Sequence, residues 1–224
     1  MSIKLCSYKC NSTSDELCFY SCGGTILDDE TILSAAHCFV SVIIVDNTTV
    51  FIEAGIKIDG CPTAWCPSGQ DISVQEIIIH PNWDPAYRGA PYRNDIAILK
   101  LANPLQWNSN VQPACLPDIQ FNPDKGFVSG WGSTDPYDPE STSYILKFLS
   151  VNVFSNEKCN EAWVANAIEN NIECQDLDSE IIDCSNATFI YPSMICAAAE
   201  NIGNIFRLVK IIAICNPCLE AIYV

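Results

Sequence analysis

Short apolar runs separated by turn residues constrain the fold of this 224-residue chain more than any other feature. Such runs, rich in Ile, Val, Leu and Phe, are typical of strands, and clusters of Gly, Pro, Asn and Asp between them are typical of turns. The runs cover residues 25–27, 31–33, 40–45, 50–52, 74–79, 96–101, 127–129 and 149–154. Their spacing predicts an all-β sandwich or barrel. One helix is expected over Ser155–Asn166, with Ser155 as its N-cap.

Composition narrows the possible partners. Apolar residues make up 49% of the chain, which is enough for a sizeable core, and the formal net charge is −16. A field of that sign repels phosphate backbones and anionic membrane surfaces, so we expect no nucleic-acid partner. No stretch reaches the roughly 20 apolar residues of a membrane span. No ligand cluster indicates a cofactor or a metal ion, and we expect neither.

Fourteen cysteines indicate an oxidising compartment, and we expect a secreted, extracellular protein with disulfide bonds. Glycosylation sequons at Asn11, Asn47 and Asn186 agree with that compartment. Residues 1–9 contain two lysines and lack the apolar run of a signal peptide. We therefore expect that no signal peptide is present in this chain and that residue 1 is not the native start.

Two cysteine pairs flank short loops. Cys174 and Cys184 lie at the ends of the acidic stretch 169–183. We interpret this stretch as an exposed loop that a disulfide between the two cysteines could close. Cys61 and Cys66 could close a smaller loop or bind a metal ion. The acidic, secreted type of composition favours a disulfide over a metal site.

His37 is one of two histidines, and it stands directly before Cys38. A bond between Cys22 and Cys38 would close a loop of about 17 residues, stabilise the fold by roughly 3 kcal/mol and fix the backbone beside His37. A catalytic imidazole needs such rigidity, because small misplacements cost large factors in rate. His80, by contrast, is interpreted as an ordinary polar residue.

Asp95 stands directly before the apolar run 96–101, where the chain enters the core. A buried carboxylate is costly unless a donor pairs with it. The Nδ1–H of an imidazole is a suitable donor, and this pairing leaves Nε2 to act as a general base. The two residues together therefore predict a catalytic His37–Asp95 pair.

Beyond these two residues, the chain resembles the chymotrypsin/trypsin family of serine proteases, in motifs that follow the family's order over residues 22–197. The motifs are Cys22-Gly-Gly-Thr-Ile-Leu, Leu33-Ser-Ala-Ala-His-Cys38, Ile79-His-Pro-Asn, Asn94-Asp-Ile-Ala-Ile-Leu-Lys-Leu101, Cys115-Leu-Pro117, Val128-Ser-Gly-Trp-Gly132 and Met194-Ile-Cys-Ala197. The resemblance implies that His37 is the general base and Asp95 its orienting carboxylate. It also implies that the substrate is a protein or peptide whose peptide bonds are hydrolysed.

The resemblance further implies two Greek-key six-stranded barrels with the active site between them, the second barrel being incomplete. We expect a divergent N-terminal segment at 1–21 and a first barrel at 22–117 that lacks its first strand. A partial second barrel at 118–200 and a divergent apolar tail at 201–224 would follow. The resemblance pairs Cys22 with Cys38 and Cys159 with Cys196. It leaves Cys115 to pair with Cys6, Cys10 or Cys18.

Two family motifs do not occur in this sequence: the Gly-Asp-Ser-Gly-Gly turn, which carries the nucleophile and the oxyanion hole, and the Ile-Val-Gly-Gly start. The resemblance thus implies a serine-type endopeptidase domain that is inactive as written. One interpretation is an active secreted protease whose sequence is recorded incompletely. The alternative is a non-catalytic protease homologue that acts as a secreted binding module. Cys215 is disfavoured as a substitute nucleophile, because no glycine turn surrounds it.

Overall fold

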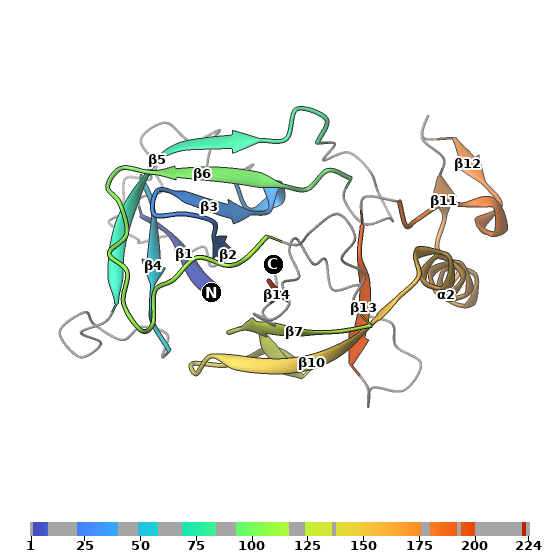
Figure 1. Ribbon diagram of the computed structural model, residues 1–224. Helices are drawn as coiled ribbons and strands as arrows, with labels where there is room; N and C mark the ends of the chain where they lie inside the picture. The colour runs from blue at the N-terminus through green and yellow to red at the C-terminus, as the bar shows by residue number, and fades with distance from the viewer. Residues whose placement is uncertain are drawn as a thin grey trace.

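The computed structural model describes residues 2–8, 22–39, 49–57, 69–83, 93–116, 124–135, 138–175, 180–191, 194–199 and 221–222. Strands dominate this part of the chain, and Figure 1 shows them in two groups, with β1 to β6 above and β7, β10 and β13 below. The predicted apolar runs all overlap strands, apart from 40–45, which lies outside the described residues. The all-β prediction is confirmed.

The first group of strands is a closed barrel with the order β1-β2-β3-β6-β5-β4. All of its pairings are antiparallel. Its strands are β1 (Ser2–Tyr8), β2 (Cys22–Ile26), β3 (Thr31–Ser34), β4 (Thr49–Ala54), β5 (Gln70–Ile79) and β6 (Ala97–Leu101). Closure leaves this barrel without an unpaired edge.

The prediction that this barrel lacks its first strand is wrong. Strand β1 pairs with β2 from Ser2↔Thr25 to Leu5↔Cys22, and on its other side it pairs with β4. The backbone groups of β2 and β4 need partners, and residues 2–8 supply them to both strands at once. Part of the segment 1–21 therefore belongs to the barrel.

The barrel core consists of branched aliphatic side chains from neighbouring strands. Ile26, Ile32, Ile52 and Leu99 are fully buried there. Strand β6 alternates between buried and half-buried residues, as expected for a strand with one face on a core. This alternation places the start of β6, and therefore Asp95, against the barrel interior.

The second group is a four-stranded sheet with the order β13-β10-β7-β14. Its strands are β7 (Lys125–Gly130), β10 (Lys147–Phe154), β13 (Cys196–Ala199) and β14 (Ala221–Ile222), the last running parallel to β7. Two small hairpins accompany it: β8 (Ser133–Asp135) with β9 (Asp138–Thr142), and β11 (Cys174–Gln175) with β12 (Ile181–Ile182). Within the described residues, this sheet does not close on itself.

The predicted helix is present as α2 (Asn156–Glu169) and extends three residues beyond the expected end. Ser155 is its N-cap, with the hydroxyl oxygen accepting a hydrogen bond from the backbone N–H of Lys158 at 3.3 Å. Two short 3₁₀ turns, η1 (Ala36–Phe39) and η2 (Cys184–Asn186), complete the described elements. None of the helices in this described part is long and apolar enough to cross a membrane.

Candidate active site

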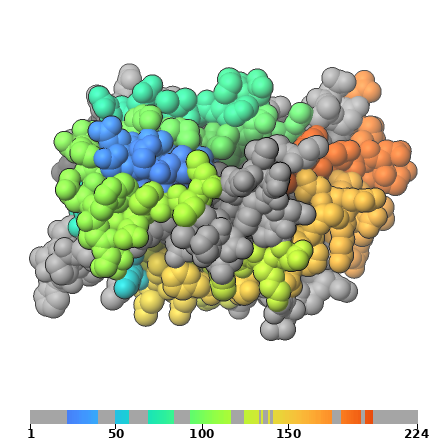
Figure 2. Space-filling model, viewed as in Figure 1, coloured from blue at the N-terminus to red at the C-terminus, as the bar shows by residue number. Residues whose placement is uncertain are grey.

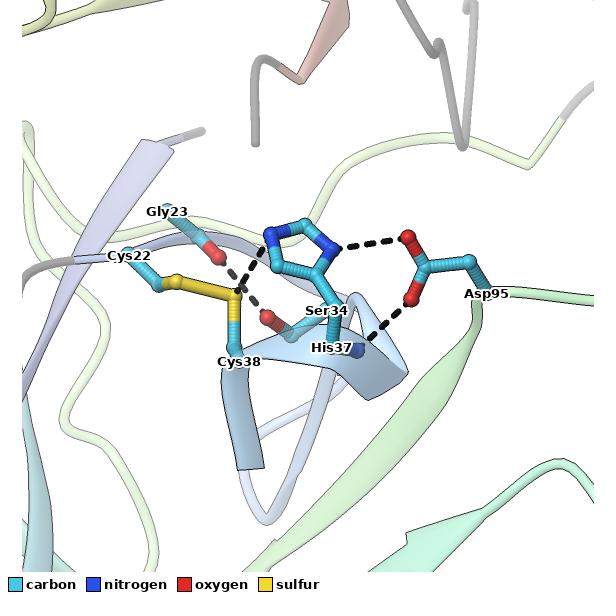
Figure 3. Close-up of a disulfide and its surroundings, with 6 residues drawn as sticks. All are labelled: Cys22, Gly23, Ser34, His37, Cys38 and Asp95. Atoms are coloured by element: carbon cyan, nitrogen blue, oxygen red, sulfur yellow. Dashed lines mark hydrogen bonds and ion pairs between the residues drawn. A yellow bond between two sulfur atoms is a disulfide. The ribbon is translucent and has the colours of Figure 1, made fainter. Parts of the chain in front are cut away.

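His37 lies in η1, directly after strand β3, where the chain is held tightly. Its neighbours Ala35 and Ala36 are fully buried, whereas 31% of the His37 side chain is exposed. The hydroxyl of Ser34 donates to the carbonyl of Gly23 at 2.9 Å and ties the end of β3 to β2 (Figure 3). The small alanines thus let the backbone pack inside the barrel while the imidazole reaches its surface.

Asp95 lies just before β6, and only 3% of the residue is exposed. The preceding Asn94 has a positive φ of 51°, a conformation that asparagine adopts more readily than most residues. Its side-chain amide donates to the carbonyl of Asn82 at 2.8 Å. This anchored turn aims the Asp95 carboxylate toward His37 (Figure 3).

The two residues are joined by a pair of short hydrogen bonds. Nδ1 of His37 lies 2.7 Å from Oδ2 of Asp95, and the backbone N–H of His37 donates to Oδ1, also at 2.7 Å. Because a carboxylate accepts at this contact, Nδ1 carries the proton of the neutral ring and Nε2 has the lone pair. The structure thus brings together the two predicted catalytic residues in an arrangement that orients Nε2 for proton transfer.

The Cys22–Cys38 disulfide holds the other side of His37. The Sγ atom of Cys38 lies 3.8 Å from Nε2 of the ring (Figure 3). Among the described residues, one Cys/His/Asp/Glu group is compact enough for a metal ion, and it consists of Cys22, His37 and Cys38. Here the two sulfurs are bonded to each other.

The other predicted cysteine pairs divide into two sets. Cys159 of α2 is bonded to Cys196 of β13, and Cys174 is bonded to Cys184 across the β11–β12 hairpin. The predicted Cys61–Cys66 pair lies outside the described residues, as do Cys10 and Cys18. Cys115 is exposed, and its pairing stays a prediction.

The structure describes one of the three predicted glycosylation sites. Asn186 is exposed in η2. Asn11 and Asn47 lie outside the described residues.

Sequence reasoning missed an aromatic contact that reaches the site from the second group of strands. The guanidinium of Arg93 lies 4.6 Å from the ring centre of Tyr191, in cation–π geometry. Arg93 is two residues before Asp95, so this contact ties the Asp95 turn to the segment before β13. No local pattern could have indicated it, because the two residues are far apart in the chain.

A second carboxylate, Asp28, supports the β2–β3 turn, which lies at the opposite end of β3 and β6 from His37 and Asp95. Burial acts to raise the pKa of Asp28, but hydrogen bonds from Thr31 and the backbone N–H of Glu30, with the charge of Lys100, outweigh it. The pKa of Asp28 is therefore lowered. The ammonium of Lys100 also donates to the Thr31 hydroxyl at 2.8 Å, which links β6 to this turn.

Comparison with known proteins identifies the family. A sequence model of the trypsin family matches residues 6–204. The chain belongs to the trypsin family. Human serine protease 41 is 30% identical over 81% of this chain and 51% of its own length. Phenoloxidase-activating factor 3 of Holotrichia diomphalia is 36% identical over 52% of this chain and 35% of its own length. The chain thus spans about half, or less, of the length of these two relatives.

A solved structure shows the same fold. Neuropsin, a serine protease expressed in the limbic system of mouse brain, superposes with a TM-score of 0.59 at 21% identity. The match covers 88% of this chain and 70% of the neuropsin chain. The predicted trypsin-type all-β fold is therefore confirmed, and the resemblance to the trypsin family is confirmed as membership.

Proposed function

We propose that this chain is a serine-type endopeptidase domain in which His37 is the general base and Asp95 orients it. One observation carries the proposal: both oxygens of the buried Asp95 carboxylate accept hydrogen bonds from His37, each at 2.7 Å. Membership of the trypsin family supports proteins as the substrate class. The exposed fraction of the His37 ring supports access of a substrate to Nε2.

The chemistry follows from this geometry. Nε2 of His37 takes the proton of an attacking serine hydroxyl as its oxygen bonds to the scissile carbonyl carbon. The Asp95 carboxylate stabilises the imidazolium that forms. The imidazolium then gives the proton to the leaving amine as the C–N bond breaks, and an acyl-enzyme is left for water to hydrolyse.

We also propose that these 224 residues alone do not hydrolyse peptide bonds, since the sequence contains no Gly-Asp-Ser-Gly-Gly turn. Both the nucleophile and the oxyanion hole reside in that turn. Assay of the purified chain on a generic peptide ester should show no turnover above a His37→Ala control. Labelling of a reactive serine by an organophosphonate would contradict this expectation.

The role of the pair can be tested in any longer form of the chain that carries the Gly-Asp-Ser-Gly-Gly turn. There, Asp95→Asn should lower kcat by about 10⁴-fold, because the amide holds the wrong imidazole tautomer. Substitution of His80, which lies outside the pair, should leave kcat unchanged. A full rate in Asp95→Asn would contradict the proposed orienting role.

A second candidate is a non-catalytic homologue that acts as a secreted binding module. It is favoured by exposed apolar side chains at and before β10, where the yellow atoms lie along the lower edge of Figure 2. These are Tyr144, Ile145, Phe148 and Leu149, between 48% and 74% exposed. Because Phe148 and Leu149 are consecutive residues of β10, they face opposite sides of the sheet, so both faces present apolar surface for a partner to cover. A stable secreted product without turnover in any isoform would favour this candidate over the protease.

Secretion and glycosylation belong to the same proposal. The disulfides of the described residues and the exposed Asn186 support them. Expression in a secretory host, followed by N-glycosidase treatment, should reduce the mass of the product. The part of that reduction contributed by Asn186 should vanish in Asn186→Gln.

A further inference from the structure

A tight turn presents Asp95 to His37. The backbone N–H of Ile96 donates to the carbonyl of Asn94 at 2.8 Å, so Asp95 is the central residue of a γ-turn. The preceding Asn94 has a φ of 51°, in the left-handed region. A left-handed residue followed by a γ-turn is a small part of the conformations open to a free chain. The direction of the carboxylate therefore depends on the contacts that hold this turn.

Two side chains hold the turn from outside. The amide of Asn94 donates to the carbonyl of Asn82, in the segment after β5, at 2.8 Å, which ties the turn to the barrel. The guanidinium of Arg93 lies 4.6 Å from the ring centre of Tyr191, inside the range of about 6 Å for a cation–π contact. Both of these side chains are half-buried, where such a contact is stronger than at a fully exposed site. The turn is thus anchored to the barrel on one side and to the second group of strands on the other.

Tyr191 extends from a braced part of the chain. The side-chain amide of Asn156, at the start of α2, donates to the carbonyl of Tyr191 at 2.9 Å. The backbone N–H of Met194 donates to the same carbonyl, also at 2.9 Å. A disulfide between Cys159 and Cys196 joins α2 to β13, the strand that follows this segment. The aromatic ring is therefore fixed with respect to the elements on the right-hand side of Figure 1.

We propose that Arg93 and Tyr191 are positioning residues for the proposed catalytic pair. Asp95 follows Arg93 by two residues, and its carboxylate holds both the ring and the backbone of His37 at 2.7 Å. A shift of the turn would therefore move both acceptors at once. Neither positioning residue bonds to His37, and each acts through the Asp95 turn. The value of this geometry for catalysis rests on the proposed function, whereas the geometry itself can be measured without it.

The Nδ1 proton of His37 reports the geometry of the pair. The chain contains two histidines, so labelling with ¹⁵N-histidine gives two sets of ring signals, and His37→Gln identifies one set by its loss. Exchange of the Nδ1 proton with water requires the contact with Asp95 to open. Tyr191→Leu removes the aromatic ring and should speed up this exchange at least about threefold, as expected for the loss of one cation–π contact.

Conservative variants and a matched control separate this contact from a general loss of packing. Tyr191→Phe keeps an aromatic ring, so its Nδ1 exchange should stay close to that of the unchanged chain. Lys158→Met removes a second cation–π contact, in which the ammonium lies 4.7 Å from the ring centre of Phe154. Because that contact does not involve the Asp95 turn, its loss should leave the exchange of the His37 proton unchanged. Urea denaturation of each variant shows how far global stability changes in parallel.

A double variant tests whether the two residues act as one unit. Arg93→Met should speed up the exchange as much as Tyr191→Leu, and it provides the same test should the latter variant fail to fold. The two substitutions together should have no larger effect than either alone, because each already removes the contact.

Three results would overturn the proposal: unchanged exchange in the single variants, an equal effect of Lys158→Met, or full addition of the single effects in the double variant. Lack of peptide hydrolysis in every form of the chain would overturn the proposed function, but it would leave the measured link between Tyr191 and the His37 proton standing.

Discussion

The carboxylate of Asp95 shows how one residue fixes the geometry of the site. It is nearly fully buried, and each oxygen accepts a hydrogen bond from a different group of His37. One bond holds the imidazole and the other holds the backbone, so ring and main chain cannot move independently. Burial without these partners would be strongly unfavourable.

This double contact predicts different effects for two substitutions. Asp95→Ala removes both acceptors and should lower the free energy of unfolding by about 1–3 kcal/mol. Asp95→Asn keeps one oxygen and should cost less, but it should change which nitrogen of the His37 ring carries the proton. Urea denaturation gives the first result, and ¹⁵N magnetic resonance of the ring gives the second. Equal stability loss in the two variants would speak against the double contact.

Asp183 provides a pH-dependent contribution to stability. Its side chain accepts a hydrogen bond from the backbone N–H of Ser185 at 2.9 Å at the start of η2, and this bond, with the Ser185 hydroxyl, lowers the pKa of Asp183. A lowered folded-state pKa means that the stabilisation is complete above the unfolded value of about 3.9. It is then lost as the pH falls through the lower folded-state pKa.

The variant Asp183→Asn isolates this contribution, because it keeps a capping oxygen but does not titrate. Urea denaturation of both proteins at several pH values should show the advantage of the native carboxylate shrinking below about pH 4. An advantage that stays constant down to pH 2 would show that the hydrogen bond is not linked to stability.

At the level of single residues, His37 before a cysteine and Asp95 before an apolar strand, taken together with the family motifs around them, predicted the pair that the structure brings into contact. The positive φ of Asn94 and the Arg93–Tyr191 contact were not predicted. Both depend on what surrounds the turn in three dimensions, which no local pattern encodes.

Among the elements, the helix and the first strand show what sequence patterns can and cannot reveal. Helix α2 was predicted because a serine cap is a local signal. Its end was missed by three residues, although it too is local: Asn171 has a positive φ of 51°, and the N–H groups of Asn171 and Ile172 donate to the carbonyls of Ile168 and Ala167. Strand β1 was missed because its place in the barrel depends on pairing with β2 and β4, which the pattern of residues 2–8 does not reveal. A short run with no turn of its own gives little indication of such pairing.

The cap of α2 leads to a direct stability prediction. Ser155→Ala removes the oxygen that accepts from the Lys158 N–H and should lower the free energy of unfolding by about 1 kcal/mol. Ser155→Asp keeps a capping oxygen and places a negative charge at the positive, N-terminal end of the helix dipole. This variant should therefore preserve stability. Denaturation in urea compares the three proteins. Equal loss in both variants would show that packing, and not capping, explains the role of Ser155.

Across the whole molecule, the two groups of strands differ in how much core they enclose. The closed barrel contains a large buried aliphatic cluster. Among the described residues, the cluster of the sheet formed by β7, β10 and β13 has three buried members, Val128, Val151 and Ala197, and Phe148 on β10 is 60% exposed. Regions with few buried apolar contacts open at lower free energy.

Hydrogen exchange should therefore separate the two groups. The backbone amides of Ile32 and Leu99 in the barrel should exchange at least about tenfold more slowly than those of Val128 and Val151 in the sheet. Exchange followed by magnetic resonance or mass spectrometry measures this difference. Cooperative exchange at one common rate would mean that the whole molecule opens as a single unit.

The hydrogen bonds between His37 and Asp95 join residues 58 positions apart in the chain. A ribosome must therefore finish the loop between them, and the strand that follows Asp95, before the imidazole has its partner. Until then, the growing chain exposes the strands around His37 without their final neighbours, which is when aggregation and chaperone binding are expected. The site thus cannot exist on a shorter nascent chain, and its assembly coincides with the arrival of β6 in the barrel.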